Sequence, residues 1–359
     1  MASNSPYRGK PRTSFWKASV SGRSPDQLRS VTHDIPSIAE NTKIMTAGSC
    51  FAQHIATRLK TTGFTVLDYE PAPGGTSRDW QLQHGFGTYS ARYGNIYFVR
   101  QLLQLLQEAE GVFSPQDWIW KSGDRYYDAL RPSIEPAGHP TQDSVRQHRT
   151  EHLAAVRRLV RDADLFVFTL GLTEGWEHIE SGTVYPTAPG TIAGDWDPTA
   201  VRFHNFSFLE IQKDLMAVIE HFRNLNPKLR ILLTVSPVAL AATATENHVL
   251  VANSYSKSVL RAVAGEITDS TNGVFYFPSF DMITGANSGD ALFAQDQRQV
   301  RQNTVDFVMQ RFVDEILRSA SPEMEANVGQ PNRAPSSLPE DQRRERQICE
   351  DSLLEDFSS

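Results

Sequence analysis

The sequence predicts an α/β fold in which helices cover both faces of a parallel sheet. Short uncharged runs, rich in branched and aromatic residues, alternate with longer segments whose apolar residues recur at helical spacing. Five runs of the first kind are present, which suits a doubly wound sheet. A chain of 359 residues is also long enough to bury a substantial core. We therefore expect five parallel strands with connecting helices.

The predicted elements follow in chain order. The expected strands are Ile44 to Ala47, Phe64 to Leu67, Leu165 to Leu170, Arg230 to Val235 and Val274 to Phe277. The expected helices are Ile96 to Glu110, Ser144 to Asp162, Phe208 to Arg223, Ala252 to Ile267 and Thr304 to Arg318. The last has one apolar face, formed by Val305, Val308, Phe312 and Ile316.

One folded domain is expected over residues 38–319. It follows a polar N-terminal extension, residues 1–37, and precedes a segment rich in Pro, Ser, Glu and Arg, residues 320–359, which we expect to be disordered. Two insertions, at about 69–94 and 112–140, interrupt the alternation of strands and helices. Long insertions at strand ends usually shape a pocket or lid.

Composition excludes several classes of function. A formal charge of -7 without a basic stripe argues against a nucleic-acid partner. The start of the chain lacks an apolar signal region, and no segment approaches the roughly 18 apolar residues of a membrane span, so a soluble cytoplasmic protein is expected. Two cysteines, Cys50 and Cys349, form no disulfide framework. The sequence contains no Walker A loop, no Gly-x-Gly-x-x-Gly after a strand and no metal-ligand spacing, so we expect no cofactor and no metal.

The most informative motif lies between the first predicted strand and the helix that follows it. The apolar strand ends at Ala47, and Gly48 permits a sharp turn before apolar residues recur at helical spacing. Ser49 and Cys50 therefore fall at the start of a helix, where backbone amides and the helix dipole favour a thiolate or an oxyanion. Cys50 is either a nucleophile or a buried structural thiol, and the residues alone leave both open.

Other polar residues follow strands of the same predicted sheet. The stretch from Gly171 to Glu174 comes after the third strand, and Ser236 and Pro237 come after the fourth. In open parallel sheets the ligand site lies beyond the carboxyl ends of the strands. We therefore expect Cys50 and these segments to converge on one site.

The chain resembles the bacterial GSCFA family at several ordered motifs, and the resemblance covers about residues 38–315. The motif that names the family is present as Gly48-Ser49-Cys50-Phe51-Ala52. The others are Thr169-Leu170-Gly171-Leu172-Thr173-Glu174-Gly175-Trp176, Val235-Ser236-Pro237-Val238, Asn253-Ser254-Tyr255-Ser256-Lys257-Ser258-Val259-Leu260-Arg261 and Phe277-Pro278-Ser279-Phe280.

That family in turn looks like a relative of the SGNH, or GDSL-type, hydrolases. The resemblance implies a three-layer α/β/α sandwich with a five-stranded parallel sheet in the order 2-1-3-4-5. It also implies esterase, deacetylase or O-acyltransferase chemistry on a small-molecule or carbohydrate ester. It leaves the oligomeric state open.

The resemblance also implies roles for particular residues. The nucleophile of the SGNH pattern is the third residue of its first block, which corresponds to Cys50, with Ser49 as the alternative if the turn is shifted. The oxyanion-hole glycine corresponds to Gly94, followed by Asn95, although Asn is also a good helix cap. Gly171, Thr173 and Glu174 fall in the third block. Thr173 would donate to an oxyanion, and Glu174 would be a general base, an orienting carboxylate or a solvated side chain.

The last SGNH block, Asp-x-x-His, departs from the pattern in this chain. It reads Asp296-Gln297-Arg298-Gln299, and glutamine cannot take up a proton at neutral pH. His54, four residues after Cys50, is the nearest substitute base along the sequence, and His84 in the first insertion is another. Two hypotheses follow. One is an acyl hydrolase or O-acyltransferase with a Cys or Ser nucleophile, and the other is a catalytically lapsed protein that binds an acylated or carbohydrate ligand or acts as a scaffold.

Overall fold

A computed structural model describes most of the chain. The described residues are 5–23, 27–28, 31–32, 35, 38–39, 41–285 and 292–320. The tail predicted from residue 320 onward lies outside them, apart from its first residue. The N-terminal part contains two short helical segments, η1 (Arg12–Ser14) and α1 (Trp16–Ser19).

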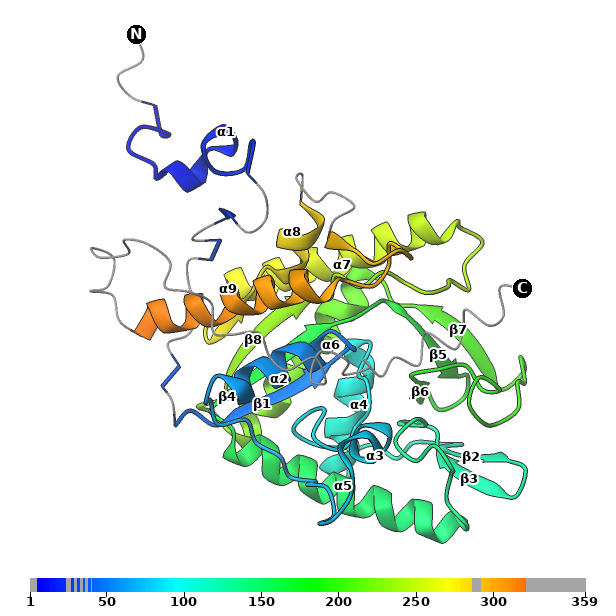
Figure 1. The fold of residues 1–359 in the computed structure, drawn as a ribbon. Coiled ribbons are helices and arrows are strands. Elements are labelled where there is room, and N and C mark those ends of the chain that lie inside the picture. The colour runs from blue at the N-terminus through cyan, green and yellow to red at the C-terminus, as the bar shows by residue number, and fades with distance from the viewer. Residues whose placement is uncertain are drawn as a thin grey trace.

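A parallel sheet forms the centre of the molecule, which confirms the predicted α/β class (Figure 1). Its strands are β1 (Ile44–Gly48), β4 (Leu165–Leu170), β8 (Arg230–Val235) and β9 (Val274–Tyr276), in the order β1-β4-β8-β9. All neighbouring pairs are parallel. The carboxyl ends of β1, β4 and β8 therefore meet at one edge of the sheet.

The strand count differs from the prediction, because residues 64–67 do not form the expected fifth strand. They make one parallel bridge, between Val66 and Ile44, on the open side of β1. Gly63, with φ +88°, turns the chain out of the preceding helix, and after Leu67 the chain enters the first insertion. Too few residues remain for a ladder, although the segment occupies the outer position that the order 2-1-3-4-5 assigns to it.

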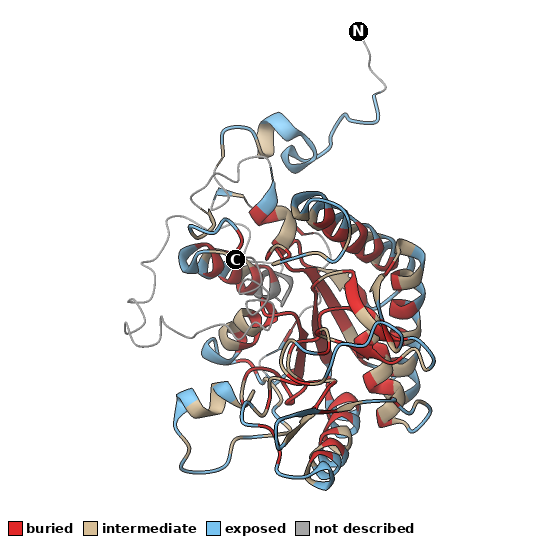
Figure 2. Cartoon of the chain, turned by 90° about the vertical axis from the view of Figure 1, so that its right-hand side faces the viewer, coloured by how far each residue is buried: buried red, intermediate tan, exposed pale blue. Residues whose placement is uncertain are grey.

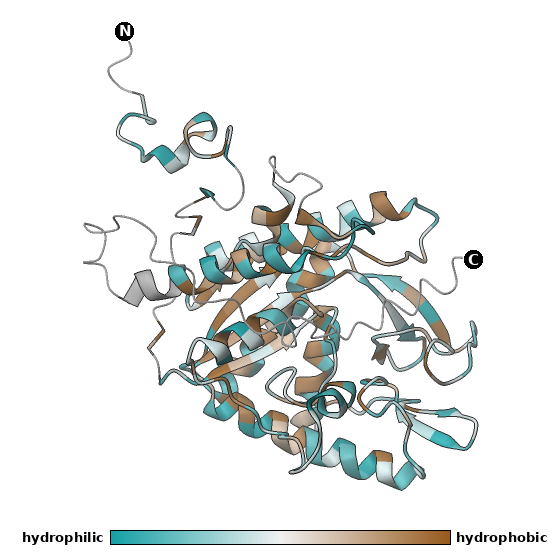
Figure 3. Ribbon diagram, viewed as in Figure 1, coloured by the Kyte–Doolittle hydropathy of each residue, from teal (hydrophilic) through white to brown (hydrophobic). Residues whose placement is uncertain are grey.

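Side chains alternate between the two faces of the sheet, as period-2 geometry requires. In β4, Leu165 and Val167 face one apolar core, whereas Phe166 and Phe168 face another. Figure 2 shows the resulting buried layers on both faces, and Figure 3 shows apolar helix faces turned toward the sheet. The first core is completed by α2 (Ala52–Thr61), α8 (Ser279–Thr284) and α9 (Gln302–Ala320), and the second by α4 (Val99–Ala109), α5 (Gln142–Asp162), α6 (Phe208–Leu225) and α7 (Val249–Ser270).

Several small elements were absent from the sequence prediction. The insertions contain α3 (Arg78–Gln83) and an antiparallel hairpin of β2 (Ile119–Ser122) and β3 (Arg125–Asp128). A second sheet, in the order β6-β5-β7, consists of β5 (Glu174–His178), β6 (Val184–Tyr185) and β7 (Val201–Asn205). Their sequences are short or rich in charged and polar residues, so they lack the apolar runs that marked the central strands.

A cluster of buried ion pairs joins the two insertions to α4 and α5. Arg149 of α5 binds Glu108 of α4, with Nε 3.1 Å from Oε1, and also approaches Asp128 of β3 at 3.4 Å. Arg131 donates from Nε to Asp128 at 2.7 Å. Because these charges are largely removed from water, each depends on its partners, and loss of one partner is far more costly than at the surface.

Glu70 and His152 extend this cluster. His152 Nδ1 lies 2.7 Å from Glu70 Oε2, which also accepts from the Arg92 amide at 2.7 Å. Burial, reinforced by the positive charge of Arg131, lowers the pKa of His152 to about 4. Burial opposes ionisation of Glu70, but its contacts with His152, Arg131 and the Arg92 amide outweigh that effect and lower its pKa to about 2. At neutral pH the pair therefore consists of a carboxylate and a neutral imidazole.

We predict that Gly48→Ala destabilises the protein by about 2–5 kcal/mol, through overpacking and backbone strain. Gly48 has φ +140°, and a Cβ there would lie 2.5 Å from the Thr169 carbonyl oxygen of β4. Gly63→Ala is the control, because φ is also positive but nothing lies within 4 Å of the added Cβ. It should cost only about 1–2 kcal/mol. Urea unfolding measures both, and equal losses would contradict the proposed crowding at Gly48.

A second prediction concerns acid stability. His152 has its ordinary pKa of 6.5 when unfolded but about 4 when folded, so below pH 6.5 the unfolded chain binds more protons. The free energy of unfolding should therefore fall by up to about 3 kcal/mol as the pH drops from 6.5 to 4. In His152→Gln this part of the pH dependence should disappear. Identical slopes in the two proteins, measured by urea unfolding across this range, would refute the assignment.

Candidate active site

The turn from β1 into α2 presents two side chains at the carboxyl edge of the sheet. The Ser49 amide donates to the Thr169 carbonyl at 3.1 Å, so Ser49 still follows the register of β1. The Ala52 and Gln53 amides then donate to the Ser49 and Cys50 carbonyls at 2.8 and 3.2 Å. The chain thus passes from strand to helix within three residues, as the motif predicted, and no side chain caps the start of α2.

Ser49 and Cys50 have different surroundings, and both are 3% exposed. Cys50 belongs to the apolar core that contains Phe51, Val238 and Phe277. Ser49 lies beside Gly171, and a Cβ added to that glycine would come within 3.0 Å of the Ser49 Cβ. The Ser49 Oγ is buried and has no hydrogen-bond partner in the described structure. Such a group normally costs about 1–3 kcal/mol, so it requires an explanation.

Asn95 lies within a hydrogen-bond network beside Ser49. The Tyr89 hydroxyl is 3.0 Å from the Ser49 carbonyl oxygen and 2.6 Å from Asn95 Oδ1. Gln53 Nε2 also donates to Asn95 Oδ1 at 3.3 Å, and Asn95 Nδ2 donates to the Tyr97 hydroxyl at 3.2 Å. Asn95 does not cap α4, because that helix begins only at Val99. The alternative interpretation of Asn95 as a helix cap is therefore wrong.

Backbone hydrogen bonds hold this segment across the end of β1. The Ile96 amide donates to the Gly48 carbonyl at 2.9 Å. The amides of Gly171 and Leu172 both donate to the Tyr97 carbonyl, at 3.1 and 3.0 Å. Gly171 has no room for a side chain, since a Cβ would lie 2.7 Å from the same carbonyl oxygen. Gly48, Ser49, Asn95 and Gly171 are thus brought together.

A small open hollow, with about 10 Å³ of enclosed space, adjoins the Asn95 network. None of its lining side chains is charged. One of them, Thr88, is 7% exposed, and its Oγ1 is buried without a hydrogen-bond partner. The hollow therefore suits a neutral polar group. Its lining residues are Gln53, Gln83, Gly85, Thr88, Tyr89, Gly94, Asn95, Ser133 and Ile134.

Thr173 and Glu174 are engaged away from Ser49. The Thr173 hydroxyl donates to Asn205 Oδ1 at 2.7 Å, and its amide donates to the Ser256 hydroxyl at 3.0 Å. Glu174 begins β5 and accepts from the Thr243 hydroxyl at 2.8 Å. Burial raises the pKa of Glu174 above its usual value. In this structure Thr173 therefore ties β7 of the second sheet to α7, and Glu174 anchors the loop before α7.

Asp296 and Gln299 lie in an exposed turn before α9. Asp296 Oδ1 accepts from the amides of Arg298 and Gln299, both at 3.0 Å, which is a local turn arrangement. The buried member of the block is Arg298, whose Nε donates to the Ala239 carbonyl at 3.1 Å. The block is therefore fastened to the segment that follows β8, through a residue to which no sequence pattern assigned a role.

The two candidate substitute bases pack against aromatic rings. The His54 ring meets Phe51 edge to face at 5.7 Å between centroids. The His84 ring stacks on Trp80 at 4.0 Å, and its Nδ1 lies 2.8 Å from the Trp80 carbonyl oxygen. Within the described part of the chain, neither a histidine nor a carboxylate is hydrogen-bonded to Ser49 Oγ.

Tyr89, Gln53 and Tyr97 complete the network, and no sequence pattern assigned a role to them. Only the position of Tyr89 within the first insertion hinted at a pocket. Lys257 had no role either, and it donates from Nζ to the Gly171 carbonyl. Its place in a family motif was the available signal. The described residues contain no group of three His, Cys, Asp or Glu side chains that could hold a metal ion, and none of their helices is long and apolar enough to cross a membrane.

Comparisons with known proteins bear on the family and the fold. The GSCFA family profile matches residues 43–312, which is more than half of the chain. Similar solved structures include a carbohydrate esterase family 3 protein from Talaromyces cellulolyticus, with 9% identity and a TM-score of 0.38, covering 78% of this chain and 99% of that one. A GDSL-like lipase from Bacteroides thetaiotaomicron has 10% identity and a TM-score of 0.37, covering 79% of this chain and 93% of that one.

A third similar structure is the periplasmic domain of a lipopolysaccharide acetyltransferase from Salmonella ser. Paratyphi A. It has 10% identity and a TM-score of 0.33, and the match covers 78% of this chain and 84% of that one. No curated protein matches the chain.

We predict that Tyr89→Phe lowers the free energy of unfolding by about 1–2 kcal/mol, because Asn95 Oδ1 and the Ser49 carbonyl oxygen lose the one buried hydroxyl proton that lies between them. Tyr255→Phe is the matched control, since Tyr255 is 47% exposed and should change stability little. Urea unfolding of both variants is the measurement. A Tyr89→Phe protein as stable as the control would contradict the network.

Proposed function

We propose that this chain, which belongs to the GSCFA family, transfers an acyl group from an ester at the turn between β1 and α2. Cys50 is the proposed nucleophile and Ser49 the alternative. The observation that carries the proposal is the placement of both residues at the carboxyl edge of a parallel sheet, at the start of a helix. Helix N-termini favour a thiolate, and their amides stabilise an oxyanion.

The reaction we propose has two steps. The Cys50 thiolate attacks the ester carbonyl carbon, the tetrahedral oxyanion collapses, and the C–O bond breaks to release an alcohol that takes up a proton. Water or a second hydroxyl group then attacks the thioester, which returns the thiolate and yields an acid or a new ester. The backbone amides of the turn and of Gly94 are the proposed oxyanion donors. One such donor is typically worth about 10²–10³ in kcat.

The hollow beside Asn95 suggests a class of substrate. Its side chains are amides and hydroxyls with one isoleucine, and there is no charge among them. A charged substrate would find no partner there, whereas a neutral ester of a small alcohol or sugar would meet donors and acceptors. We propose that the alcohol part of the ester lies over the mouth of this hollow when Ser49 is the nucleophile, because the hollow adjoins the Asn95 network beside Ser49, whereas Cys50 lies in the apolar core. The buried hydroxyl of Thr88, which is one of the lining residues, would then gain the partner that it lacks in the described structure.

A second candidate is ligand binding without catalysis. The observation that favours it is the exposed turn of Asp296 and Gln299, in which the carboxylate binds backbone amides and a glutamine replaces the expected base. The same hollow would then hold an acylated or carbohydrate ligand that the protein does not cleave.

Intact-mass spectrometry after exposure to p-nitrophenyl acetate tests the first candidate. We expect one acetyl adduct on the wild-type protein and its loss in Cys50→Ala. Cys349→Ala, which removes the other cysteine, should keep both the adduct and turnover, and Ser49→Ala reports on the alternative nucleophile. An adduct that persists in Cys50→Ala and vanishes in Ser49→Ala would transfer the role to Ser49. A wild-type protein that gains no acetyl adduct and shows no turnover would refute the proposed acyl transfer.

Gln299→His separates the two candidates further. If the site is intact except for its base, this variant should gain p-nitrophenyl acetate turnover by about 10²-fold or more, the range typical of general-base assistance. Gln295→His, in the same exposed turn, controls for an added surface imidazole. Equal rates in the two variants would mean that position 299 does not serve the reacting thiol.

A further inference from the structure

The first turns of α7 carry a row of polar side chains toward the carboxyl edge of the sheet. Asn253 Oδ1 accepts from the Leu240 amide at 3.1 Å, in the segment that follows β8. The Ser256 hydroxyl accepts from the Thr173 amide at 3.0 Å, in the segment that follows β4. Side chains at this spacing share one helix face. The motif from Asn253 to Arg261 therefore fastens α7 to two loops at the edge that holds the candidate site.

Lys257 adds a positive charge to this face of α7. The residue is 3% exposed, and its Nζ donates to the Gly171 carbonyl at 2.5 Å. Buried lysines are rare, because the transfer of an ammonium group out of water is costly. A carbonyl oxygen accepts a hydrogen bond but cannot donate one, so it suits the charged form of the amine. The contacts of Asn253 and Ser256 already hold α7 to the same edge, so attachment alone does not explain a charge here.

Gly171 lies between Lys257 and Ser49. Its carbonyl oxygen binds Nζ, and a Cβ added to its Cα would come within 3.0 Å of Ser49 Cβ. Covalent geometry then places Nζ within about 10 Å of Ser49 Cβ. Cys50 lies in the other apolar core, to which α7 contributes no residue. The charge of Lys257 therefore lies on the Ser49 side of the turn.

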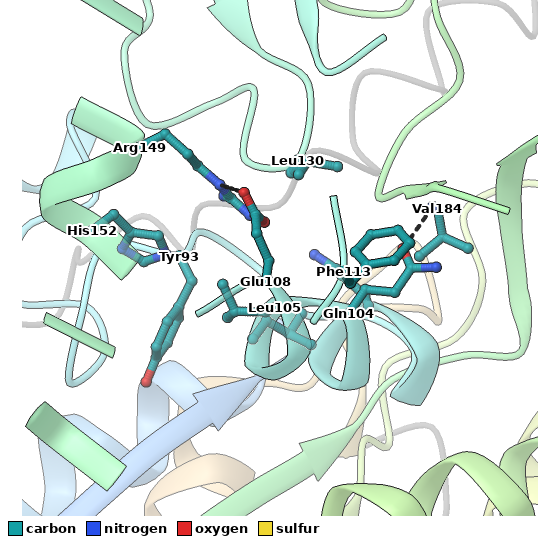
Figure 4. Close-up of a pocket in the computed structure, with 11 residues that line it drawn as sticks. Tyr93, Gln104, Leu105, Glu108, Phe113, Leu130, Arg149, His152 and Val184 are labelled. Atoms are coloured by element: carbon teal, nitrogen blue, oxygen red, sulfur yellow. Dashed lines mark hydrogen bonds and ion pairs between the residues drawn. The ribbon is translucent and has the colours of Figure 1, made fainter. Parts of the chain in front are cut away.

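Other buried charges belong to ion pairs that hold elements of the fold together. Figure 4 shows Arg149 of α5 facing Glu108 of α4, a contact that joins the two helices. Arg261, one turn beyond Lys257 on α7, binds Asp281 of α8 with Nε 2.9 Å from Oδ1. Lys257 differs in its position, because its charge lies at the turn that carries the candidate nucleophiles.

We propose that Lys257 is a positioning residue that favours a negative charge on the side chain at position 49. When that side chain ionises, its proton passes to water, and the ammonium group beside Gly171 stabilises the anion that remains. Glu174, the carboxylate three residues after Gly171, accepts from the Thr243 hydroxyl instead. The inference rests on the proposed acyl transfer with Ser49 as the nucleophile, but the ionisation of position 49 can be measured without any ester.

The test introduces a thiol as a probe of this ionisation. In a protein that carries Ser49→Cys and Cys50→Ala, the ultraviolet absorbance of the thiolate reports the pKa of the introduced thiol, and subtraction of the Cys50→Ala parent removes the signal of Cys349. Adding Lys257→Met, which replaces the ammonium group by an uncharged side chain of similar length, should raise that pKa by about 1 or more. Lys213→Met, at an exposed position of α6, is the matched control and should leave it unchanged. Equal pKa values with and without Lys257→Met would overturn the proposal.

Ester turnover gives a second readout, which loss of a purely structural contact would not move in the same way. In the protein with its natural Ser49, Lys257→Met should lower p-nitrophenyl acetate turnover near neutral pH by about tenfold and shift the pH profile of kcat/KM to higher pH. Lys257→Arg keeps the charge and should recover most of the rate. A thiol pKa that depends on Lys257 in a protein that gains no acetyl adduct would support the charge effect and refute acyl transfer, so the two failures are distinguishable.

A further measurement decides the question if Lys257→Met does not fold. The thiol of Ser49→Cys is then titrated with Lys257 in place. Burial alone would hold its pKa above the ordinary value of about 8.5, whereas a nearby positive charge lowers it. A pKa below that value supports the proposal, and a pKa above it overturns the proposal.

Discussion

The close approach of β1 to β4 at Gly48 is the constraint on which the candidate site depends. Only a residue without a side chain lets the end of β1 lie against the Thr169 backbone, because a Cβ would be 2.5 Å from the carbonyl oxygen. The Ser49 amide then keeps its bond to that carbonyl while the chain turns into α2. Ser49 and Cys50 are consequently divided between the two sides of the sheet edge.

The segment of residues 89–97 lies across this turn and contributes the second part of the candidate site. Its backbone is fixed at both strands, through the Ile96 amide to Gly48 and through the Tyr97 carbonyl to Gly171. These backbone bonds leave the Tyr89 hydroxyl free to lie between the Ser49 carbonyl oxygen and Asn95 Oδ1. The buried ion pairs hold the two insertions in place. The hollow beside Asn95 therefore depends on charged groups that do not line it.

How well each strand could be predicted depends on whether its residues form a continuous apolar run. Leu165 to Leu170 and Arg230 to Val235 were predicted at the bounds that the structure confirms, because buried parallel strands require continuous apolar runs. β5, with the sequence Glu-Gly-Trp-Glu-His, has no such run, and its strand character depends on pairing with β7. Residues 64–67 have the composition of a strand but lack the length of extended chain needed for a ladder.

Prediction of the site met a different limit. Ser49 and Cys50 could be placed at the turn, since turns and helix starts are encoded locally. Asn95 was singled out by the family resemblance and not by a local helix signal, because α4 begins only at Val99. Tyr89 and Gln53 could not be identified as partners of Asn95, because those contacts depend on how an insertion folds back over the sheet. The motif with Asp296 and Gln299 illustrates the converse, since a recognisable spacing forms only a local turn there.

Hydrogen bonds from several elements fix the position of Asn95. Its side chain lines the small hollow, while its carbonyl oxygen accepts from Gln101 of α4. Gln101 in turn accepts from the Tyr97 amide. A displacement of α4 would therefore move Gln101 and, with it, the backbone that carries Asn95. Because Tyr89 joins Asn95 to the Ser49 carbonyl oxygen, the packing of α4 is coupled to the geometry of the turn between β1 and α2.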